Sequence, residues 1–256
     1  MLNTLNYREV KKELFMKVSE KIRKKIKKIP KGTTFTYNDL FIERSEYVAA
    51  SKAIERLINE GLLKRVSTGV FYIPKITVFG ELRPPEEELL KPYLFENGQR
   101  IAYITGTSLY NQMGLTTQVP KSIKIACKNK RITASIKGIE IKPVKSYIDV
   151  TNSNYYLLEV LDALKDFKII PDIDKKGAIT ILKNKIDSFS EKEVASIIRY
   201  VLLYPPRTRA LLGAILELLG KVEYLEKLRL SLNPFSSYSF GIKSSILLTS
   251  KNWSIV

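Results

Sequence analysis

Several polar side chains between residues 45 and 60 have the chemistry of a surface that reads DNA bases. If this segment is helical, its apolar residues share one face and four polar residues lie elsewhere: Ser51, Lys52, Glu55 and Arg56. Lysine and arginine bind guanine edges, and serine contacts base edges or phosphate. The segment therefore predicts a DNA-contacting helix with Ser51, Lys52 and Arg56 as binding residues.

Side chains on either side of this segment suit the phosphate backbone of the same duplex. Tyr37 and Asn38 precede it and are expected to bind phosphates. Arg65, Ser67 and Thr68 follow it, where a hairpin would meet the backbone or the minor groove. The alternative is a protein-interaction module in which these residues are merely solvated. The basic surface of the chain favours DNA.

The chain carries a large excess of positive charge. Its 43 lysines and arginines exceed its 26 acidic residues, which gives a net charge of +17. Residues 121–145 are strongly basic, with Glu140 as their only acidic side chain. Such an excess attracts polyanions, so nucleic acid is the expected partner. The predicted second basic patch comprises Lys121, Lys124, Lys128, Lys130 and Arg131.

The composition restricts catalytic chemistry. With no histidine and one cysteine, a His-based triad, an HExxH zinc site and a Cys-only zinc site are excluded within one chain. Glu140 and Lys142 alternate on a predicted strand and share a face, as in part of a metal-dependent nuclease site. Such a site needs another acidic ligand, but residues 81–139 contain no aspartate. Asp172 and Asp174 are interpreted as a polar turn. We expect no enzyme activity, cofactor or metal; the alternative is a nucleic-acid-processing enzyme using Glu140 and Lys142.

The elements around the DNA-contacting residues follow the order of a winged helix-turn-helix. Apolar residues recur at helical spacing in the first segment, which Pro30 ends: Val18, Ile22, Ile26 and Ile29. The remaining pieces are a short strand near residues 33–35, a short helix at 36–40, a helix from Ser45 (its N-cap) to Glu60, Gly61 as the C-terminal cap, and strands at 62–66 and 70–73.

Beyond residue 80 the pattern indicates a mixed domain, with Gly80 and Pro84-Pro85 at the boundary. Strand-like runs at 122–126, 131–136 and 139–144 predict an antiparallel meander. Other expected elements are a strand near 101–104, helices at 107–113, 157–164, 191–204 and 208–220, and a strand at 246–249. The predicted fold class is α+β: an N-terminal extension (1–15), a winged helix-turn-helix (16–80) and a mixed α/β C-terminal domain with a small antiparallel sheet (81–256).

The remaining composition indicates a cytoplasmic protein. No apolar run approaches the ~20 residues that a membrane span requires, and the N-terminal segment lacks the apolar core of a secretory signal. The single cysteine, Cys127, fits a reducing compartment. Met16 is an alternative start, so residues 1–15 are interpreted as an extension.

Several blocks of the sequence resemble the abortive-infection AbiEi-type antitoxins. In the first part these are Pro30-Lys31-Gly32, Asp39-Leu40, Ala53-Ile54-Glu55-Arg56-Leu57, Gly61 and Gly69-Val70-Phe71-Tyr72-Ile73-Pro74. The resemblance continues over residues 105–115 and 117–120 and ends with residues 204–214 and 231–234. It covers most of the chain from about Lys17, and the block from Gly106 to Pro120 is its more specific part.

This resemblance implies the antitoxin of a bacterial type IV toxin–antitoxin system. Such proteins bind inverted repeats in their own promoter and repress their operon through the N-terminal domain. Their C-terminal domain is needed to neutralise a nucleotidyltransferase-like toxin, directly or indirectly. No membrane partner is implied. A further alternative is a plain transcription factor whose second domain senses a ligand.

Overall fold

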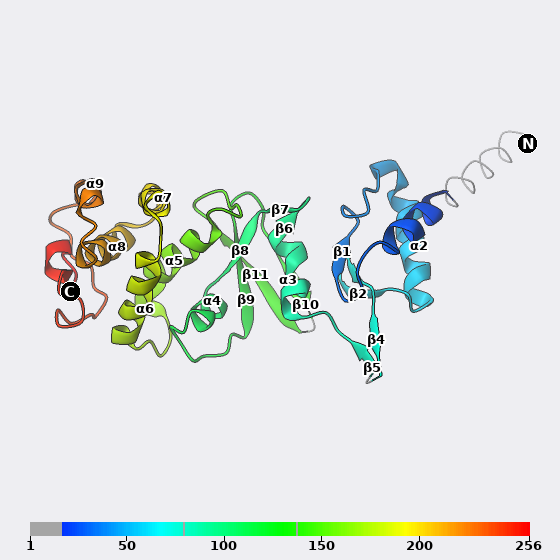
Figure 1. The fold of residues 1–256 in the computed structure, drawn as a ribbon, viewed down its shortest axis with the longest axis horizontal. Helices are drawn as coiled ribbons and strands as arrows, with labels where there is room; N and C mark the ends of the chain where they lie inside the picture. The colour runs from blue at the N-terminus through cyan, green and yellow to red at the C-terminus, as the bar shows by residue number, and fades with distance from the viewer. Residues whose placement is uncertain (1–16, 79, 137) are drawn as a thin grey trace, which may run out of the picture. The chain divides into compact units, whose positions relative to one another are not determined.

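The computed structural model describes residues 17–78, 80–136 and 138–256, so the predicted extension at residues 1–15 lies outside the described residues. The protein is α+β and forms two compact units (Figure 1). The first unit contains the described residues up to Gly98 together with residues 135–138, and the second contains residues 99–134 and 139–256. The first unit thus continues past the expected division at residue 80, because α3 (Glu86–Leu94) packs on β1 (Thr34–Thr36). The hydroxyl of Thr34 donates to the carbonyl oxygen of Glu88 at 2.6 Å.

The first unit is built around a small sheet and two helical segments. Strand β3 pairs antiparallel with β1 on one side and β2 on the other. As predicted, Val18, Ile22 and Ile26 are buried along the first helical segment, but this helix ends at residue 26, before Pro30, and Ile29 beyond it is only partly buried. In chain order the elements are a helix over residues 17–26, β1, η1 (Arg44–Glu46), α2 (Tyr47–Asn59), β2 (Lys64–Ser67), β3 (Val70–Tyr72), β4 (Lys75–Thr77), β5 (Gly80–Leu82), α3 and β6 (Phe95–Glu96).

Helix α2 ends where a glycine permits the left-handed conformation. Gly61 has φ +74°, and its amide donates to the carbonyl of Ile58 at 3.0 Å. The amide of Leu62 donates to the carbonyl of Leu57 at 3.0 Å, which completes a Schellman motif. The predicted C-terminal cap is confirmed.

Two local predictions in the first unit are wrong. Residues 37–41 form hydrogen-bonded turns instead of a short helix, and Phe41 has a positive φ of 47° that prevents helical continuation. Asp39 stabilises this turn because its carboxylate accepts from the Thr36 amide at 2.7 Å. Ser45 is not an N-cap, since it lies inside η1. A capping box between Glu43 and Glu46 begins that element instead.

The second unit combines a sheet with a set of packed helices. In the sheet, β9 lies between β8 and β11, and α5 packs against β8. In chain order its elements are β7 (Gln99–Arg100), β8 (Ala102–Thr105), α4 (Thr107–Gln112), β9 (Ser122–Cys127), β11 (Ile139–Lys145), α5 (Tyr155–Asp166), η2 (Phe167–Ile169), α6 (Lys175–Asp187), α7 (Glu191–Val201), α8 (Pro206–Leu218), η3 (Val222–Tyr224), α9 (Leu225–Leu230) and η4 (Ser250–Trp253). β10 (Ala134–Ile136) lies between β9 and β11 in the chain, and its residues 135 and 136 belong to the first unit.

The sheet is mixed, so the predicted antiparallel meander is wrong. β8 and β9 are antiparallel, but β9 and β11 pair in parallel, with Ile141 opposite Ile123. β11 therefore runs in the same direction as β9 and lies directly beside it. The burial of Ile125, Ala126 and Cys127 fits a strand with neighbours on both sides.

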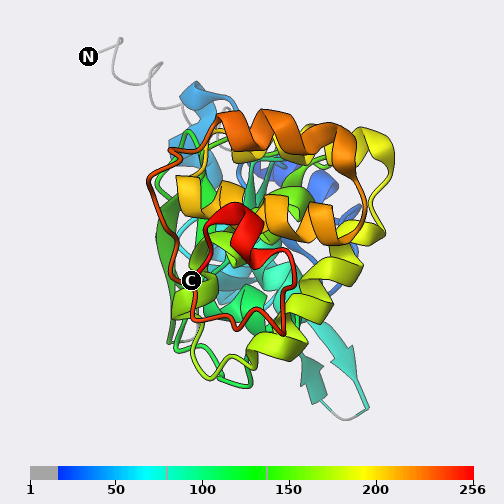
Figure 2. The same cartoon turned by 90° about the vertical axis from the view of Figure 1, so that its left-hand side faces the viewer.

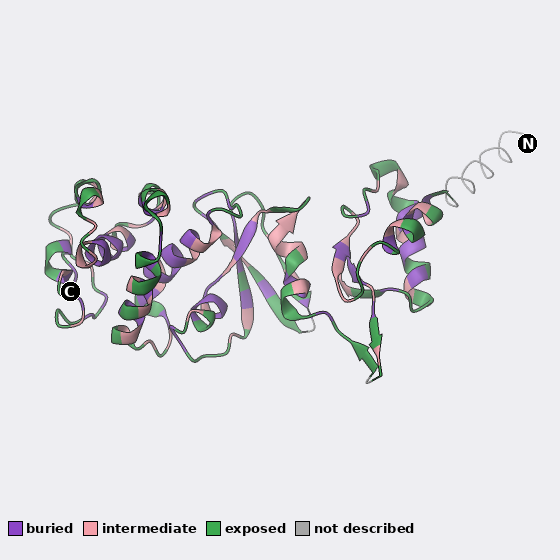
Figure 3. Cartoon of the chain, in the orientation of Figure 1, coloured by how far each residue is buried: buried purple, intermediate pink, exposed green. Residues whose placement is uncertain are grey.

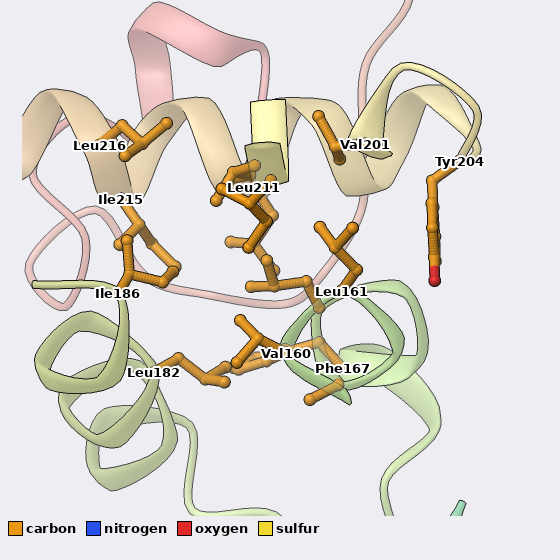
Figure 4. Packing of buried hydrophobic residues seen from close by; sticks show 14 of the residues in the cluster. Val160, Leu161, Phe167, Leu182, Ile186, Val201, Tyr204, Leu211, Ile215 and Leu216 are labelled. Atoms are coloured by element: carbon orange, nitrogen blue, oxygen red, sulfur yellow. The ribbon is translucent and has the colours of Figure 1, made fainter. Parts of the chain in front are cut away.

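The apolar core of the second unit lies among its helices. Figure 4 shows side chains from α5, α6 and α8 meeting there, among them Leu161, Leu182 and Leu211. α8 is buried along most of its length, as Figure 3 shows. Figure 2 faces this helix, α9 and the C-terminal η4, and both α9 and η4 pack on α8.

Two elements of the second unit differ from prediction. Residues 175–187 form a helix that was not predicted, α6, whose N-cap Asp174 accepts from the amides of Lys176 and Gly177. Residues 246–249 form turns instead of a strand, because the amide of Ile246 bonds back to Lys243 and the Thr249 hydroxyl bonds to Ala214 of α8. Pro206 begins α8 as its first residue, two positions earlier than expected.

Candidate nucleic-acid interface

Helix α2 presents a polar and basic face to solvent. Lys52, Glu55 and Arg56 are exposed, and Ser51 is partly exposed. The opposite face packs into the core of the first unit through Ala49, Ala50, Ala53, Ile54 and Leu57. Alanines on the buried side bring the helix close to its neighbours in the core. The three predicted DNA-contacting residues of α2 therefore share one accessible side.

Ion pairs fix α2 at both ends against the first helical segment. Lys21 Nζ lies 2.8 Å from Glu46, the residue before α2, and Arg23 lies 2.9 Å from Glu60, the residue after it. The hydrogen bond from Lys21 holds the pKa of the Glu46 carboxyl below its ordinary value. Charged contacts at both ends of α2 thus accompany its packing against the apolar core.

Two exposed apolar side chains begin α2, and the sequence prediction did not include them among the site residues. Tyr47 is 52% exposed and Val48 is 63% exposed. Val48 shares its side of the helix with Ser51, Lys52 and Glu55, because residues three, four and seven positions apart lie on one face. The sequence contained a signal for Val48, because it precedes the polar residues Ser51, Lys52 and Glu55 by three, four and seven positions.

The predicted phosphate contacts before α2 differ in their accessibility. Asn38 is exposed in the turn. The Tyr37 ring is partly buried, with its centroid 5.0 Å from the Tyr47 ring and 5.3 Å from the Phe71 ring. The ring of Tyr37 therefore supports the start of α2 by packing.

The hairpin of β2 and β3 carries the other predicted backbone contacts. Thr68 is exposed at its turn, and the Arg65 guanidinium lies 5.7 Å from the Phe71 ring centroid. The Ser67 hydroxyl is hydrogen-bonded to the hydroxyl of Tyr93 on α3. Sequence reasoning missed Tyr93, which follows Ser67 by 26 positions. Any contact of Ser67 with nucleic acid would compete with this bond.

The predicted second basic patch lies in the second unit and is spread along β9. Lys121 precedes the strand, whereas Lys128, Lys130 and Arg131 follow its end, and all four are exposed. Six strand residues separate the two groups by roughly 20 Å. The alkyl chain of Lys124, between them, lies against Gly106, where an added Cβ would come within 2.8 Å of it.

An open depression of about 390 Å³ lies at the carboxyl ends of the parallel strands β9 and β11. Its lining includes Lys128, Lys130, Arg131 and also Lys145, which parallel pairing places beside Cys127. Asp149 orders the adjoining loop, because its carboxylate lies 2.6 Å from Lys128 and accepts from the Asn129 amide at 3.0 Å. The Lys128 hydrogen bond lowers the pKa of Asp149. The structure thus brings four of the basic side chains of residues 121–145 to one concave surface.

The two residues of the nuclease alternative lie on β11. Lys142 Nζ lies 3.4 Å from Glu140 Oε2, and both side chains are more than half exposed. Within residues 17–78, 80–136 and 138–256, no group of three or more His, Cys, Asp or Glu side chains is arranged to hold a metal ion. Asp174, the N-cap of α6, and Asp172, which accepts from Gln118, have structural contacts.

Among the described helices, none has the length and apolar content that crossing a membrane requires.

Comparisons with known proteins identify a family and a shared fold. Residues 21–186 match the sequence profile of a family described as "Family of unknown function (DUF6088)". Among curated proteins, none matches the chain. The crystal structure of the RV2827C protein from Mycobacterium tuberculosis is similar, with a TM-score of 0.50 at 12% sequence identity over 88% of this chain and 85% of that one. At this identity the likeness concerns the fold alone.

Proposed function

The chain belongs to the DUF6088 family, a family of unknown function, and we propose that this member is a double-stranded DNA-binding protein. Its first unit acts as a winged helix-turn-helix in which α2 enters the major groove. The hairpin of β2 and β3 is the wing beside it.

One observation carries this proposal: α2 is buried on one face, and its exposed face carries Lys52 and Arg56. Base edges in the major groove are accessible to a helix, and both side chains bind guanine N7 and O6 there. A turn precedes α2 and a two-stranded hairpin follows it, which is the order of elements in winged helix domains. The net charge of +17 adds long-range attraction for the phosphate backbone.

The biological role that we propose is that of a cytoplasmic antitoxin and autorepressor. Its support is the resemblance of the sequence to AbiEi-type antitoxins. The first unit would bind inverted repeats in its own promoter. The second unit, with its basic depression, would take part in neutralising a nucleotidyltransferase-like toxin. No cofactor or catalytic residue is assigned.

DNA binding is tested by measuring affinity for duplex DNA from upstream of the gene, in a shift assay at several salt concentrations. The Lys52→Ala/Arg56→Ala variant should bind at least about tenfold more weakly, since each base contact contributes roughly 1–3 kcal/mol. The matched control, Lys192→Ala/Lys251→Ala, removes two exposed charges from the second unit and should retain specific affinity. Salt should weaken binding steeply. Equal affinity of both double variants would contradict the proposed role of α2.

The antitoxin role has a separate test. A neighbouring nucleotidyltransferase-like gene is expressed alone and together with this protein, and growth is measured. The protein should restore growth, and the Lys52→Ala/Arg56→Ala variant should also restore it, because neutralisation is assigned to the second unit. Failure of the intact protein to restore growth would overturn the antitoxin role and leave DNA binding standing.

A further inference from the structure

Two side chains on the exposed face of α2 are unsuited to binding phosphate. Val48 is apolar, and Glu55 is an anion that a phosphate would repel. They lie seven residues apart, so both project from the same side of the helix. Lys52 lies between them and Arg56 lies beside Glu55. The proposed DNA-facing surface therefore contains an apolar group, two cations and one carboxylate.

Folding of the first unit does not account for Val48. The buried face of α2 consists of other residues, from Ala49 to Leu57, while Val48 remains 63% exposed. A β-branched residue also lowers helix propensity relative to alanine, so its presence adds nothing to the stability of an exposed position. Its surface is available to an apolar group on a partner. The thymine 5-methyl group is the apolar group that the major groove presents.

Glu55 also has no polar partner among the residues that the structure describes. Among the described residues, no hydrogen bond or ion pair holds its carboxylate, although Glu46 and Glu60 near the two ends of the same helix are both paired. A carboxylate that faces DNA is repelled by the phosphate backbone. A hydrogen bond from a donor on a base edge can offset this repulsion. In the major groove, glutamate accepts from the N4 amino group of cytosine.

We propose that Val48 and Glu55 determine sequence specificity, with Val48 contacting a thymine 5-methyl group and Glu55 accepting from a cytosine N4 amino group. This inference rests on the proposed DNA binding by α2. Seven helical residues correspond to about 10 Å along the helix axis, which is roughly three base-pair steps. The preferred half-site consequently contains a thymine and a cytosine separated by about that distance.

The test uses the full chain and a preferred duplex selected from a random pool. Each thymine in that duplex is replaced in turn by deoxyuridine, which removes only the 5-methyl group. At one position the replacement should lower the affinity of the intact protein about fourfold, which is the equivalent of one methyl-sized apolar contact. The same replacement should leave the affinity of Val48→Ala unchanged. Val222→Ala, an exposed valine in the second unit, serves as the control and should respond as the intact protein does.

The second arm measures cytosine preference in the same duplex. Replacing one C·G pair should lower the affinity of the intact protein roughly 5- to 150-fold, and the Glu55→Ala variant should lose that discrimination. Glu226→Ala, in the second unit, should keep it. Circular dichroism checks that each variant is folded.

The outcomes separate the inference from the proposed function. Specific binding that is insensitive to uracil, or discrimination that survives both substitutions, would overturn the specificity roles and leave DNA binding intact. Binding without any preferred duplex would overturn the specificity roles alone, whereas failure to bind any duplex would overturn the proposed DNA binding as well.

Discussion

The contact between Gly213 and Trp253 provides a sharp test of how the second unit is held together. An added Cβ at position 213 would lie 2.2 Å from Cζ3 and 2.3 Å from Cη2 of the indole ring. Carbon atoms pack at about 3.5–4.0 Å, so the ring must move by more than 1 Å. Trp253 is 1% exposed and its indole N–H donates to Glu217, so the ring has little space in which to move.

The expected effect of Gly213→Ala has two opposing parts. Alanine is preferred over glycine inside a helix by about 1 kcal/mol. Displacing a buried tryptophan costs up to ~3–5 kcal/mol, by analogy with its removal. Gly213→Ala should therefore lower the free energy of unfolding by about 2–4 kcal/mol. In the Trp253→Ala background the indole ring is absent, so Gly213→Ala should raise the free energy of unfolding by about 1 kcal/mol.

Urea denaturation of the four proteins in this double-mutant cycle measures the effect. Trp253 is the only tryptophan, so its fluorescence reports on the second unit wherever it is present. Far-ultraviolet circular dichroism follows the variants that lack it. A stabilising Gly213→Ala in the otherwise intact protein, or the same cost in both backgrounds, would refute the packing argument.

Two further predictions concern buried charge in the second unit. Burial raises the pKa of the Glu159 carboxyl to about 7 from the ordinary 4.5, so its contribution to stability is complete below about pH 4.5 and is lost as the pH rises through 7. Glu159→Gln should therefore make the free energy of unfolding less dependent on pH between these values, and it should stabilise the protein by about 2 kcal/mol at pH 8. Urea denaturation at several pH values measures both effects, and an unchanged pH dependence would contradict this prediction. Asp162 is 2% exposed and accepts from Tyr103 at 3.0 Å and Thr105 at 2.7 Å, while Lys165 lies 2.8 Å away. Asp162→Asn should destabilise by ~3 kcal/mol in thermal denaturation, because it leaves Lys165 without its closest partner, and Lys165→Met in the same variant should recover part of the loss.

Local elements were predictable where one short stretch of sequence contains the complete signal. The apolar spacing of Val18, Ile22 and Ile26 identified the first helical segment, and Gly61 identified the end of α2. Ser190, directly before the helix predicted at 191–204, caps α7 through a capping box with Glu193, and both residues lie within one turn of the sequence. α6 also had a signal, since its buried residues follow helical spacing, but the polar run before it obscured where the helix begins.

The candidate site was predictable to the same extent. Helical periodicity placed Lys52 and Arg56 on the exposed side of α2, and the structure agrees. Periodicity says nothing about partners distant in sequence. It therefore missed the bond between Ser67 and Tyr93, and it missed Lys145 beside the basic residues that follow β9.

The sequence by itself determined the α+β class, the amphipathic helices, several helix ends and the strong positive charge, because these depend on residue type and on spacing within one or two turns. Only the tertiary structure decided that β9 and β11 pair in parallel and that Trp253 packs against Gly213. Both contacts join segments that are distant in the sequence. Many alternative chain paths satisfy the same local patterns, and the burial of the whole core selects among them.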